Sequence, residues 1–268
     1  MNRHTQSEQE ISALLSDCGF FSSAECYDTI TSTNDRAKEL AACGAPQGTV
    51  VLSETQTNGR GRMGRHFYSP QGSGLYMSLI LRPRASQADA GLLTACAAVS
   101  VWKAILKLTG VPVSIKWVND LYYDNKKLCG ILAEGQFDAL GELDYVVLGI
   151  GINLRPPQKG YADEISGKTI SLAELPLHND VPEQLSLCVE IVKQWSLLYE
   201  ALPETDFLHI YRDHSNILGK TIQFLKNGAV MTGLALSIDD CARLLIQREN
   251  GEIITLETGE VNLIRPVL

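Results

Sequence analysis

The spacing of apolar runs changes near Ile217, and this change constrains the fold more than any other feature of the sequence. After Gly219, five short runs of apolar and β-branched residues follow one another at near-regular intervals, with turn-forming pairs such as Asn250-Gly251 and Thr258-Gly259 between them. Evenly spaced short strands of this kind are typical of small β-barrels. The sequence therefore predicts a large domain over residues 1–217 and a small barrel over residues 218–268, with strands at 221–224, 230–236, 244–247, 253–256 and 261–264.

The larger segment mixes helical and strand patterns. Apolar residues recur at helical spacing between Ser7 and Gly19, again after Asn34, and along a stretch that begins at Ala88. Asp124-Asn125-Lys126 predicts the turn of a β-hairpin. We therefore expect a mixed α/β domain with further helices at 36–43, 88–108, 182–202 and 204–216, strands at 26–30, 49–52, 75–82, 113–117, 121–123, 128–134 and 145–154, and a mobile loop at 155–168.

Three glycines and three arginines share seven residues of an otherwise acidic chain, Gly59-Arg60-Gly61-Arg62-Met63-Gly64-Arg65. Glycine lets the backbone approach a ligand closely, and arginine matches phosphate or carboxylate oxygens with paired hydrogen bonds. This arginine loop therefore predicts a site for an anion. The simpler alternative is a solvated surface loop that is basic by chance.

The arginine loop also fits the spacing G-x-G-x-x-G of dinucleotide-binding proteins, which requires a strand before it and a helix directly after it. The apolar run from Thr49 to Leu52 can supply the strand. Pro70, Gly72 and Gly74 follow the loop too closely for a helix to form there. We therefore reject a Rossmann fold and expect a mobile loop that lies over a phosphate.

Composition and charge argue against several classes of protein. The net charge of −8 argues against a general nucleic-acid binder, which presents a basic face, and one short helix before Glu25 is too little for a helix-turn-helix reader. The polar start lacks signal-peptide character, and no stretch is expected to approach the length of a membrane span. The seven cysteines form no C-x-x-C pair. We therefore expect a cytoplasmic protein with reduced cysteines and without DNA or membrane partners.

Four separated motifs occur in one order: the arginine loop, Lys116-Trp117-Val118-Asn119-Asp120, the segment from Lys127 to Glu134, and Gly149-Ile150-Gly151-Ile152-Asn153. In these motifs the chain resembles biotin protein ligase, the enzyme that attaches biotin to a lysine of carboxylase carrier domains. The resemblance runs from about Ile30 to the C-terminus. It implies a mixed, largely antiparallel sheet flanked by helices, as in class II synthetases, in a biotin- and ATP-binding catalytic domain over residues 1–217. An SH3-like barrel over residues 218–268 should follow.

The resemblance also implies roles for individual residues. The biotin-contacting positions are matched by Ser32, Thr33, Asn34, Gln56, Arg60, Gly61, Arg62 and Lys127. The nucleotide-binding positions are matched by Arg62, Arg65, Phe67, Lys116, Asn119 and Asn153. Asp120 lies where the family handles nucleotide and metal. It is therefore a candidate ligand of Mg²⁺, or a group that orients or deprotonates the incoming amine.

The chemistry that the resemblance implies explains why cations are needed. Joining the biotin carboxylate to the α-phosphate of ATP brings two anions together, so Arg60, Arg62, Lys127 and Mg²⁺ are expected to offset their repulsion. The product, biotinyl-5′-adenylate, is a mixed anhydride that water would hydrolyse, and a loop that orders over it would protect it. A lysine of a biotin carboxyl carrier protein, in acetyl-CoA carboxylase or a related carboxylase, then attacks the acyl carbon.

Each candidate residue also has a simpler interpretation. Lys116 and Lys127 flank a hairpin, where lysines are usually solvated, and Asn119-Asp120 are common turn formers. Trp117 is more readily explained as a core residue, and Glu134 as an exposed strand residue. Two rival functions remain open, a lipoate ligase of the same superfamily and a non-catalytic biotin-binding protein.

Two positions depart from the family pattern, since Phe67 stands where tryptophan is usual and Val118 where proline is usual. Phe67 can still stack on a ring with less area, whereas Val118 imposes less rigidity on the backbone before Asn119. The sequence also shows no counterpart of the N-terminal DNA-binding domain of regulatory members. We therefore expect a monofunctional ligase rather than a repressor, and a homodimer is a hypothesis from resemblance.

Overall fold

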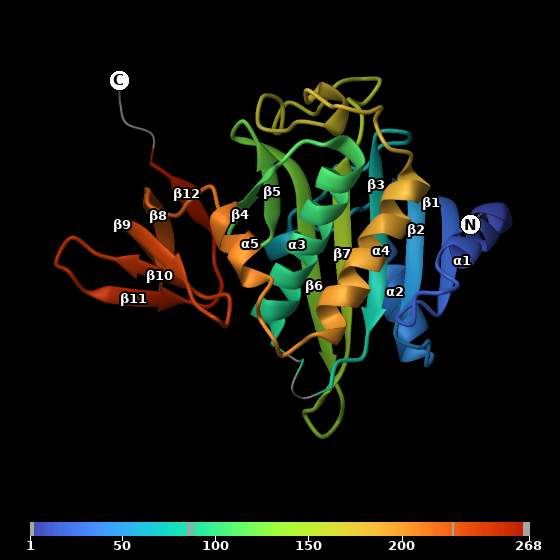
Figure 1. The fold of residues 1–268 in the computed structure, drawn as a ribbon, viewed down its shortest axis with the longest axis horizontal. Coiled ribbons are helices and arrows are strands. Elements are labelled where there is room, and N and C mark those ends of the chain that lie inside the picture. Colours follow the sequence, from blue (N-terminus) through green and yellow to red (C-terminus); the bar gives the residue numbers. More distant parts are fainter. Residues whose placement is uncertain (1–2, 85–86, 88, 227, 265–268) are drawn as a thin grey trace.

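A seven-stranded sheet forms the centre of the larger part of the molecule in a computed structural model that describes residues 3–84, 87, 89–226 and 228–264 (Figure 1). Strands β1 and β2 pair in parallel, and all the other neighbours in this sheet are antiparallel. The predicted mixed, largely antiparallel sheet is therefore confirmed. In spatial order its strands are β1 (Ser23–Ile30), β2 (Thr49–Gln56), β3 (Gly74–Leu81), β7 (Leu143–Asn153), β6 (Lys126–Phe137), β5 (Asp120–Tyr123) and β4 (Ser114–Lys116).

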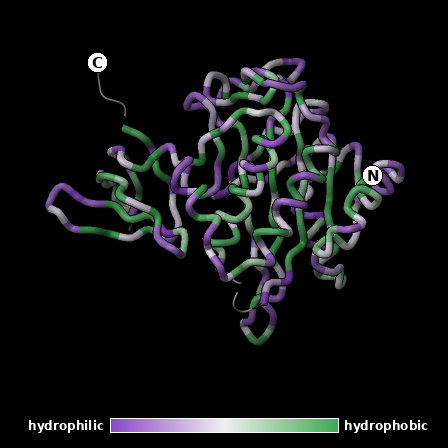
Figure 2. The backbone as a smooth tube through the Cα atoms, viewed as in Figure 1, coloured by the Kyte–Doolittle hydropathy of each residue, from purple (hydrophilic) through white to green (hydrophobic). Residues whose placement is uncertain are grey.

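Helices cover both faces of this sheet. Because side chains alternate along a strand, Leu79 and Leu81 of β3 join the core on one face, whereas Ile80 packs with Ala37 of α2 on the other. Figure 2 shows hydrophobic residues concentrated in the central strands. The first face carries α1 (Thr5–Leu14), α3 (Ala90–Thr109), α4 (Gln184–Glu200) and α5 (Leu208–Asp213), and the second carries α2 (Thr33–Ala42).

Several predicted helices have different bounds in the structure, and contacts explain the difference for α2 and α5. Helix α2 begins at Thr33 rather than Arg36, because Ser32 is its N-cap and accepts a hydrogen bond from the Asp35 amide at 3.5 Å. Helix α5 spans only part of the predicted 204–216, because the backbone after Asp213 bonds to β4: the Ile115 amide donates to the His214 carbonyl at 2.8 Å. The predicted start of α3 at Ala88 lies outside the described residues.

Helix α3 corrects one expectation drawn from the sequence. Among the residues that the structure describes, it is the one helix long and apolar enough to cross a membrane, whereas no such stretch was expected. However, 72% of its apolar window is buried inside the molecule, where Ala97, Val101 and Ile105 are fully covered. Burial of this extent is typical of the core helix of a globular domain, and the apolar composition of α3 is explained by that packing.

The C-terminal part is a five-stranded antiparallel sheet that contacts the larger part. The expected five short strands are confirmed, in the order β11 (Ile253–Leu256), β10 (Leu244–Gln247), β9 (Ala229–Ile238), β8 (Thr221–Lys226) and β12 (Val261–Leu263). Trp117 Nε1 donates to the Ala242 carbonyl at 2.9 Å, and Arg212 Nε donates to the Ile238 carbonyl at 2.6 Å. The boundary between domains over 1–217 and 218–268 stays a prediction.

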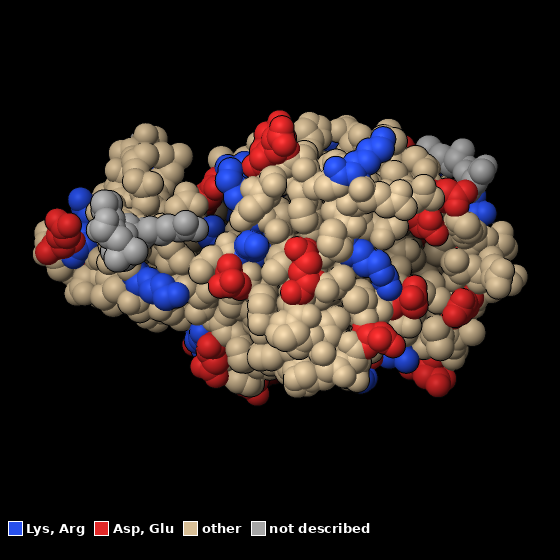
Figure 3. Space-filling view, turned by 90° about the horizontal axis from the view of Figure 1, so that it is seen from above, with Lys and Arg blue, Asp and Glu red and all other residues tan. Residues whose placement is uncertain are grey.

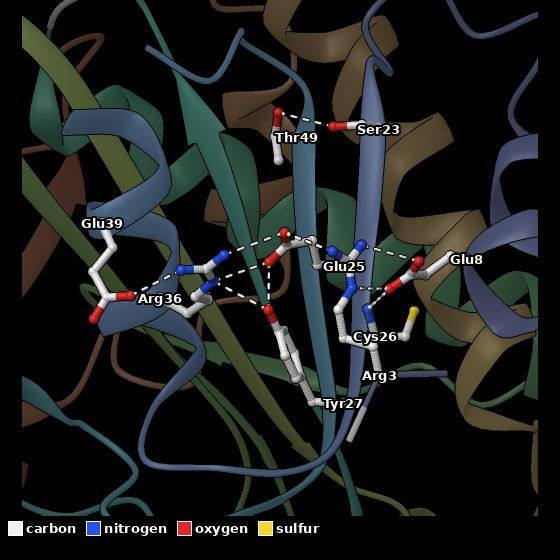
Figure 4. Close-up of polar contacts among 9 residues, drawn as sticks. All are labelled: Arg3, Glu8, Ser23, Glu25, Cys26, Tyr27, Arg36, Glu39 and Thr49. Atoms are coloured by element: carbon white, nitrogen blue, oxygen red, sulfur yellow. Dashed lines mark hydrogen bonds and ion pairs between the residues drawn. The ribbon is translucent and has the colours of Figure 1, made fainter. Parts of the chain in front are cut away.

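A polar cluster ties the N-terminal segment to the edge of the larger sheet (Figure 4). Arg3 lies between Glu8 of α1 and Glu25 of β1, at 2.9 and 3.3 Å, and Arg36 of α2 reaches the same Glu25 at 2.9 Å. Arg3 also forms a β-bridge with Tyr27, so it covers part of the exposed edge of β1. The cluster therefore fastens both α1 and α2 to this strand.

Charged side chains of both signs are interspersed on the face of the molecule in Figure 3, separated by uncharged surface. The positive charge of the chain is therefore not gathered on this face, in agreement with a net charge of −8. A localised group of cations instead lies around the cavity described next.

Candidate active site

A cavity of about 360 Å³ lies where the arginine loop meets the central strands of the larger sheet. Its volume is in the range usual for small-molecule sites. Every site residue predicted from the sequence lines it: Ser32, Thr33, Asn34, Gln56, Arg60, Gly61, Arg62, Arg65, Phe67, Lys116, Asn119, Asp120, Lys127 and Asn153. The fold thus brings together residues that are dispersed along the sequence between Ser32 and Asn153.

Glycines of β6 and β7 form the floor of the cavity. A Cβ atom at Gly151 would lie 2.6 Å from Cε1 of the Phe67 ring, and one at Gly149 would collide with the Asn34 side chain. Only glycine lets these side chains lie directly on the sheet. The glycines therefore do more than pack within their strands, because they make room for the residues above them.

The N-terminus of α2 closes one end of the cavity. Ser32, Thr33 and Asn34 are almost fully buried, and Thr33 donates from its backbone amide to Gln56 Oε1 at 2.9 Å. Gln56 in turn donates to Ser69 Oγ at 2.9 Å. Ser32 does serve as an N-cap, as the simpler interpretation predicted, but it also lines the cavity together with its two neighbours.

The arginine loop folds into a compact turn over the cavity. It contains a short 3₁₀ turn, η1 (Arg62–Gly64), and the amide of Gly61 donates to the Arg65 carbonyl at 2.7 Å. The chain then continues without a helix to β3, which confirms the rejection of a Rossmann fold. The loop is thus held by its own backbone hydrogen bonds.

Four cations that line the cavity each contact an acidic or polar side chain. An incoming anion can exchange for these acceptors, which are the partners of the cations in this structure. The contacts are Arg60 with Asp35 at 2.7 Å, Arg62 with Asn119 and with Thr258 at 3.0 Å each, Arg65 with Glu260 at 2.6 Å, and Lys127 with Asp120 at 2.6 Å.

Burial and pairing change the titration of two groups at the cavity. Burial lowers the pKa of the Lys116 amine, which lies 5.3 Å above the centre of the Tyr122 ring. The hydrogen bond from Arg65 lowers the pKa of Glu260, so this carboxyl is ionised at neutral pH. The cavity thus combines anchored cations with a carboxylate from the C-terminal sheet.

The segment that carries Asn119 and Asp120 is fixed by contacts on both sides. Trp117 is buried, as its core interpretation predicted, and the Tyr211 hydroxyl donates to the Val118 carbonyl at 2.8 Å. Asn119 Nδ2 donates to the Ile131 carbonyl of β6 at 2.6 Å. These contacts hold the backbone in place where the family usually has a proline.

The sequence alone did not indicate that the C-terminal sheet reaches the cavity. Gly259, Glu260 and Val261 line it, although Thr258-Gly259 had been interpreted only as a turn between strands. Lys168 and Thr169 also line it, because the Lys127 amide donates to the Lys168 carbonyl at 2.8 Å and so draws the end of the 155–168 loop against β6.

The cavity has a glycine floor, a buried polar end and several cations along its wall, and these features suit a small anionic ligand. The sequence profile of the Biotin/lipoate A/B protein ligase family matches residues 26–153. The Bifunctional ligase/repressor BirA of Bacillus subtilis is 34% identical over 84% of this chain and 69% of its own length. The Biotin–[acetyl-CoA-carboxylase] ligase of Mycobacterium tuberculosis is 30% identical over 86% of this chain and 85% of its own.

Solved structures show the same fold. The biotin protein ligase from Aquifex aeolicus in complex with biotin and ATP superposes with a TM-score of 0.78 at 28% sequence identity, over 91% of this chain and 100% of that one. The chain therefore belongs to the biotin protein ligase family and is a ligase.

Proposed function

We propose that this ligase activates biotin with ATP as biotinyl-5′-AMP and transfers the biotinyl group to a lysine of a biotin carboxyl carrier protein. The observation that carries the proposal is the convergence of Arg60, Arg62 and Lys127 on one cavity whose far end is closed by buried polar groups of α2. The relatives support it, since one is named as a ligase of biotin and acetyl-CoA carboxylase and the structure of another holds biotin and ATP.

The first step joins two anions. An oxygen of the biotin carboxylate attacks the α-phosphorus of ATP, a P–O bond to the β-phosphate breaks, and pyrophosphate leaves. Arg60, Arg62 and Lys127 exchange their present acceptors for phosphate and carboxylate oxygens, and so stabilise the negative charge that develops at phosphorus. This step needs no nucleophile from the protein.

The second step transfers the acyl group. The ε-amine of the carrier lysine attacks the acyl carbon of the adenylate, AMP leaves, and the nitrogen loses a proton. Asp120 orients the amine or accepts that proton in this proposal, which is supported by the position of its carboxylate at the cavity wall, 2.6 Å from Lys127.

The donor set at the cavity fits a magnesium ion that arrives with ATP. Within residues 3–84, 87, 89–226 and 228–264, no three His, Cys, Asp or Glu side chains are grouped as a cage for a metal. Mg²⁺ is usually bound by one or two carboxylates together with substrate phosphates. Asp120 would hold it, and when bound the ion supplies further positive charge near the phosphates.

The polar end of the cavity favours biotin over lipoate. Ser32, Thr33, Asn34 and Gln56 offer donors and acceptors that suit the ureido group of biotin, whereas the dithiolane ring of lipoate has no matching polar groups. Sites built for hydrogen bonds reject ligands that lack the matching groups. Measuring which of the two acids supports pyrophosphate release from ATP separates these functions.

A direct test is incubation of the protein with ATP, Mg²⁺, biotin and a carrier domain, followed by intact-mass measurement of the carrier. We expect the carrier mass to increase by one biotinyl group only when both ATP and biotin are present. A protein that binds biotin but leaves the carrier mass unchanged would be a non-catalytic biotin-binding protein.

The expected cytoplasmic location and homodimer stay predictions, and light scattering tests the homodimer.

Replacing Gly151 by alanine is expected to raise the dissociation constants of biotin and ATP at least about tenfold, because the added methyl group pushes Phe67 off the floor of the cavity. Calorimetric titration measures both constants. The matched control is Gly135→Ala in β6, a strand glycine outside the cavity, whose added Cβ meets only Leu143 at 3.1 Å. Unchanged affinity in Gly151→Ala would show that the floor does not contact either ligand.

A further inference from the structure

A chain of polar contacts runs from the N-terminus of α2 to Glu134 of β6, the last residue of the segment from Lys127 to Glu134. Asn34 Nδ2 donates to Glu134 Oε2 at 2.8 Å, and Lys38 Nζ, one helical turn further along α2, donates to Glu134 Oε1 at 2.6 Å. Both oxygens of the Glu134 carboxylate are therefore engaged by the same helix. The expectation that Glu134 is a simple exposed strand residue is wrong, since only 25% of its side chain is exposed.

The other end of the Asn34 amide is fixed as well. Ser78 of β3 donates from its hydroxyl to Asn34 Oδ1 at 2.6 Å, and the same hydroxyl lies 2.8 Å from Thr33 Oγ1. A Cβ at Gly149 would collide with Asn34, so the amide lies directly against β7. A carboxylate accepts and a hydroxyl donates here, so the orientation of the amide is determined at both ends.

The charge state of Glu134 suits this role. Burial acts to raise the pKa of Glu134, but the hydrogen bonds from Lys38 and Asn34 outweigh it and lower the pKa below its usual value. Glu134 is therefore a carboxylate at neutral pH and can only accept hydrogen bonds. Lys38 offsets the cost of holding this charge in a half-buried position.

We infer that Glu134 and Lys38 are positioning residues for biotin: they orient the Asn34 amide and hold the buried Ser32-Thr33-Asn34 end of the cavity in its binding geometry. The inference rests on the proposed function, because it takes this end of the cavity to hold biotin. Glu134 carries a negative charge, and Lys38 is not one of the cations that are proposed to bind the phosphates. Their loss should therefore weaken the binding of biotin and spare that of ATP.

The first test is Glu134→Gln, with biotin and ATP titrated separately by calorimetry. We expect the dissociation constant of biotin to rise about tenfold, the lower end of what loss of a charged hydrogen bond produces, while that of ATP changes less than about twofold. Lys38→Met, which leaves Glu134 in place, should show the same selectivity with a smaller rise. A biotin dissociation constant within twofold of the parent in both variants overturns the inference.

A second variant separates positioning from simple stabilisation of the fold. The charge-reversed double variant Lys38→Glu, Glu134→Lys restores an ion pair between α2 and β6 but leaves no acceptor at position 134 for the Asn34 amide. We expect its thermal unfolding midpoint to recover toward the parent value while biotin binding stays weak. Recovery of both together would mean that only the ion pair matters, and the inference would then be wrong.

Two controls complete the experiment. Glu190→Gln removes a similar carboxylate from a comparable pair, Lys107 with Glu190 at 2.8 Å, which joins α3 to α4 away from the cavity. We expect this variant to lose thermal stability and keep its affinity for biotin. If the parent protein binds no biotin, the proposed function itself is wrong. If the parent binds biotin and both single variants bind it equally tightly, only the positioning role is wrong.

Discussion

Lys127→Ala is expected to slow formation of biotinyl-5′-AMP by about 100- to 1,000-fold, the usual effect of removing one group that stabilises charge in a transition state. The variant also leaves the Asp120 carboxylate without its partner at 2.6 Å, beside the anionic substrates. Pyrophosphate release from ATP in the presence of biotin measures the rate.

The thermal stability of this variant should change little. The Lys127 side chain is 35% exposed, and exposed ion pairs contribute at most about 1 kcal/mol to folding. For a chain of this size that amounts to about 2–4 °C in the unfolding midpoint. The matched control is Lys126→Ala, whose side chain projects from the opposite face of β6 and should leave the rate unchanged. Equal losses of rate and stability in Lys127→Ala would favour a structural role.

Arg60→Ala is expected to release biotinyl-5′-AMP into solution about 10- to 100-fold faster than the parent, because a charged hydrogen bond to the intermediate is lost. The Arg60 side chain pairs with Asp35 at 2.7 Å, and 46% of it is exposed, so the fold should remain intact. Rapid gel filtration after the first step, with chromatographic measurement of free and retained adenylate, gives the release rate.

The control for this prediction is Arg248→Ala, a comparably exposed arginine that pairs with Glu252 at 2.9 Å between β10 and β11, outside the cavity. It should retain the adenylate as the parent does. If Arg60→Ala makes and keeps the intermediate as well as the parent does, the arginine loop does not enclose the adenylate.

Local patterns were enough to predict most of the larger sheet. The strands around Leu79 and Ile150 consist of apolar residues in runs of strand length, and their neighbours along the chain contain the turn residues that separate them. The bounds of α2 and α5 were less predictable. The first depends on a cap at Ser32, and the second on backbone bonds between β4 and residues near His214 that lie far along the chain.

The residues of the candidate site also form two groups, those that the sequence indicated and those that only the fold brought to the site. Arg60, Lys127 and Asn153 stood out because their residue types and order match a family pattern, and each lies at the cavity. Glu134 was interpreted as an exposed strand residue, and Glu260 was assigned no role. Their contacts with Asn34 and Arg65 span 100 and 195 residues of the chain, and no local spacing records them.

The sequence by itself determined the helices and strands, the arginine loop and the kind of chemistry. These features depend on periodicity, glycine content and charge, which are set by a few neighbouring residues. Only the tertiary structure decided which acceptors hold the cations, that the C-terminal sheet supplies part of the cavity wall, and that Glu134 supports Asn34. These contacts depend on how α2, β6 and β12 approach one another in space, and that approach is set by the packing of the whole core.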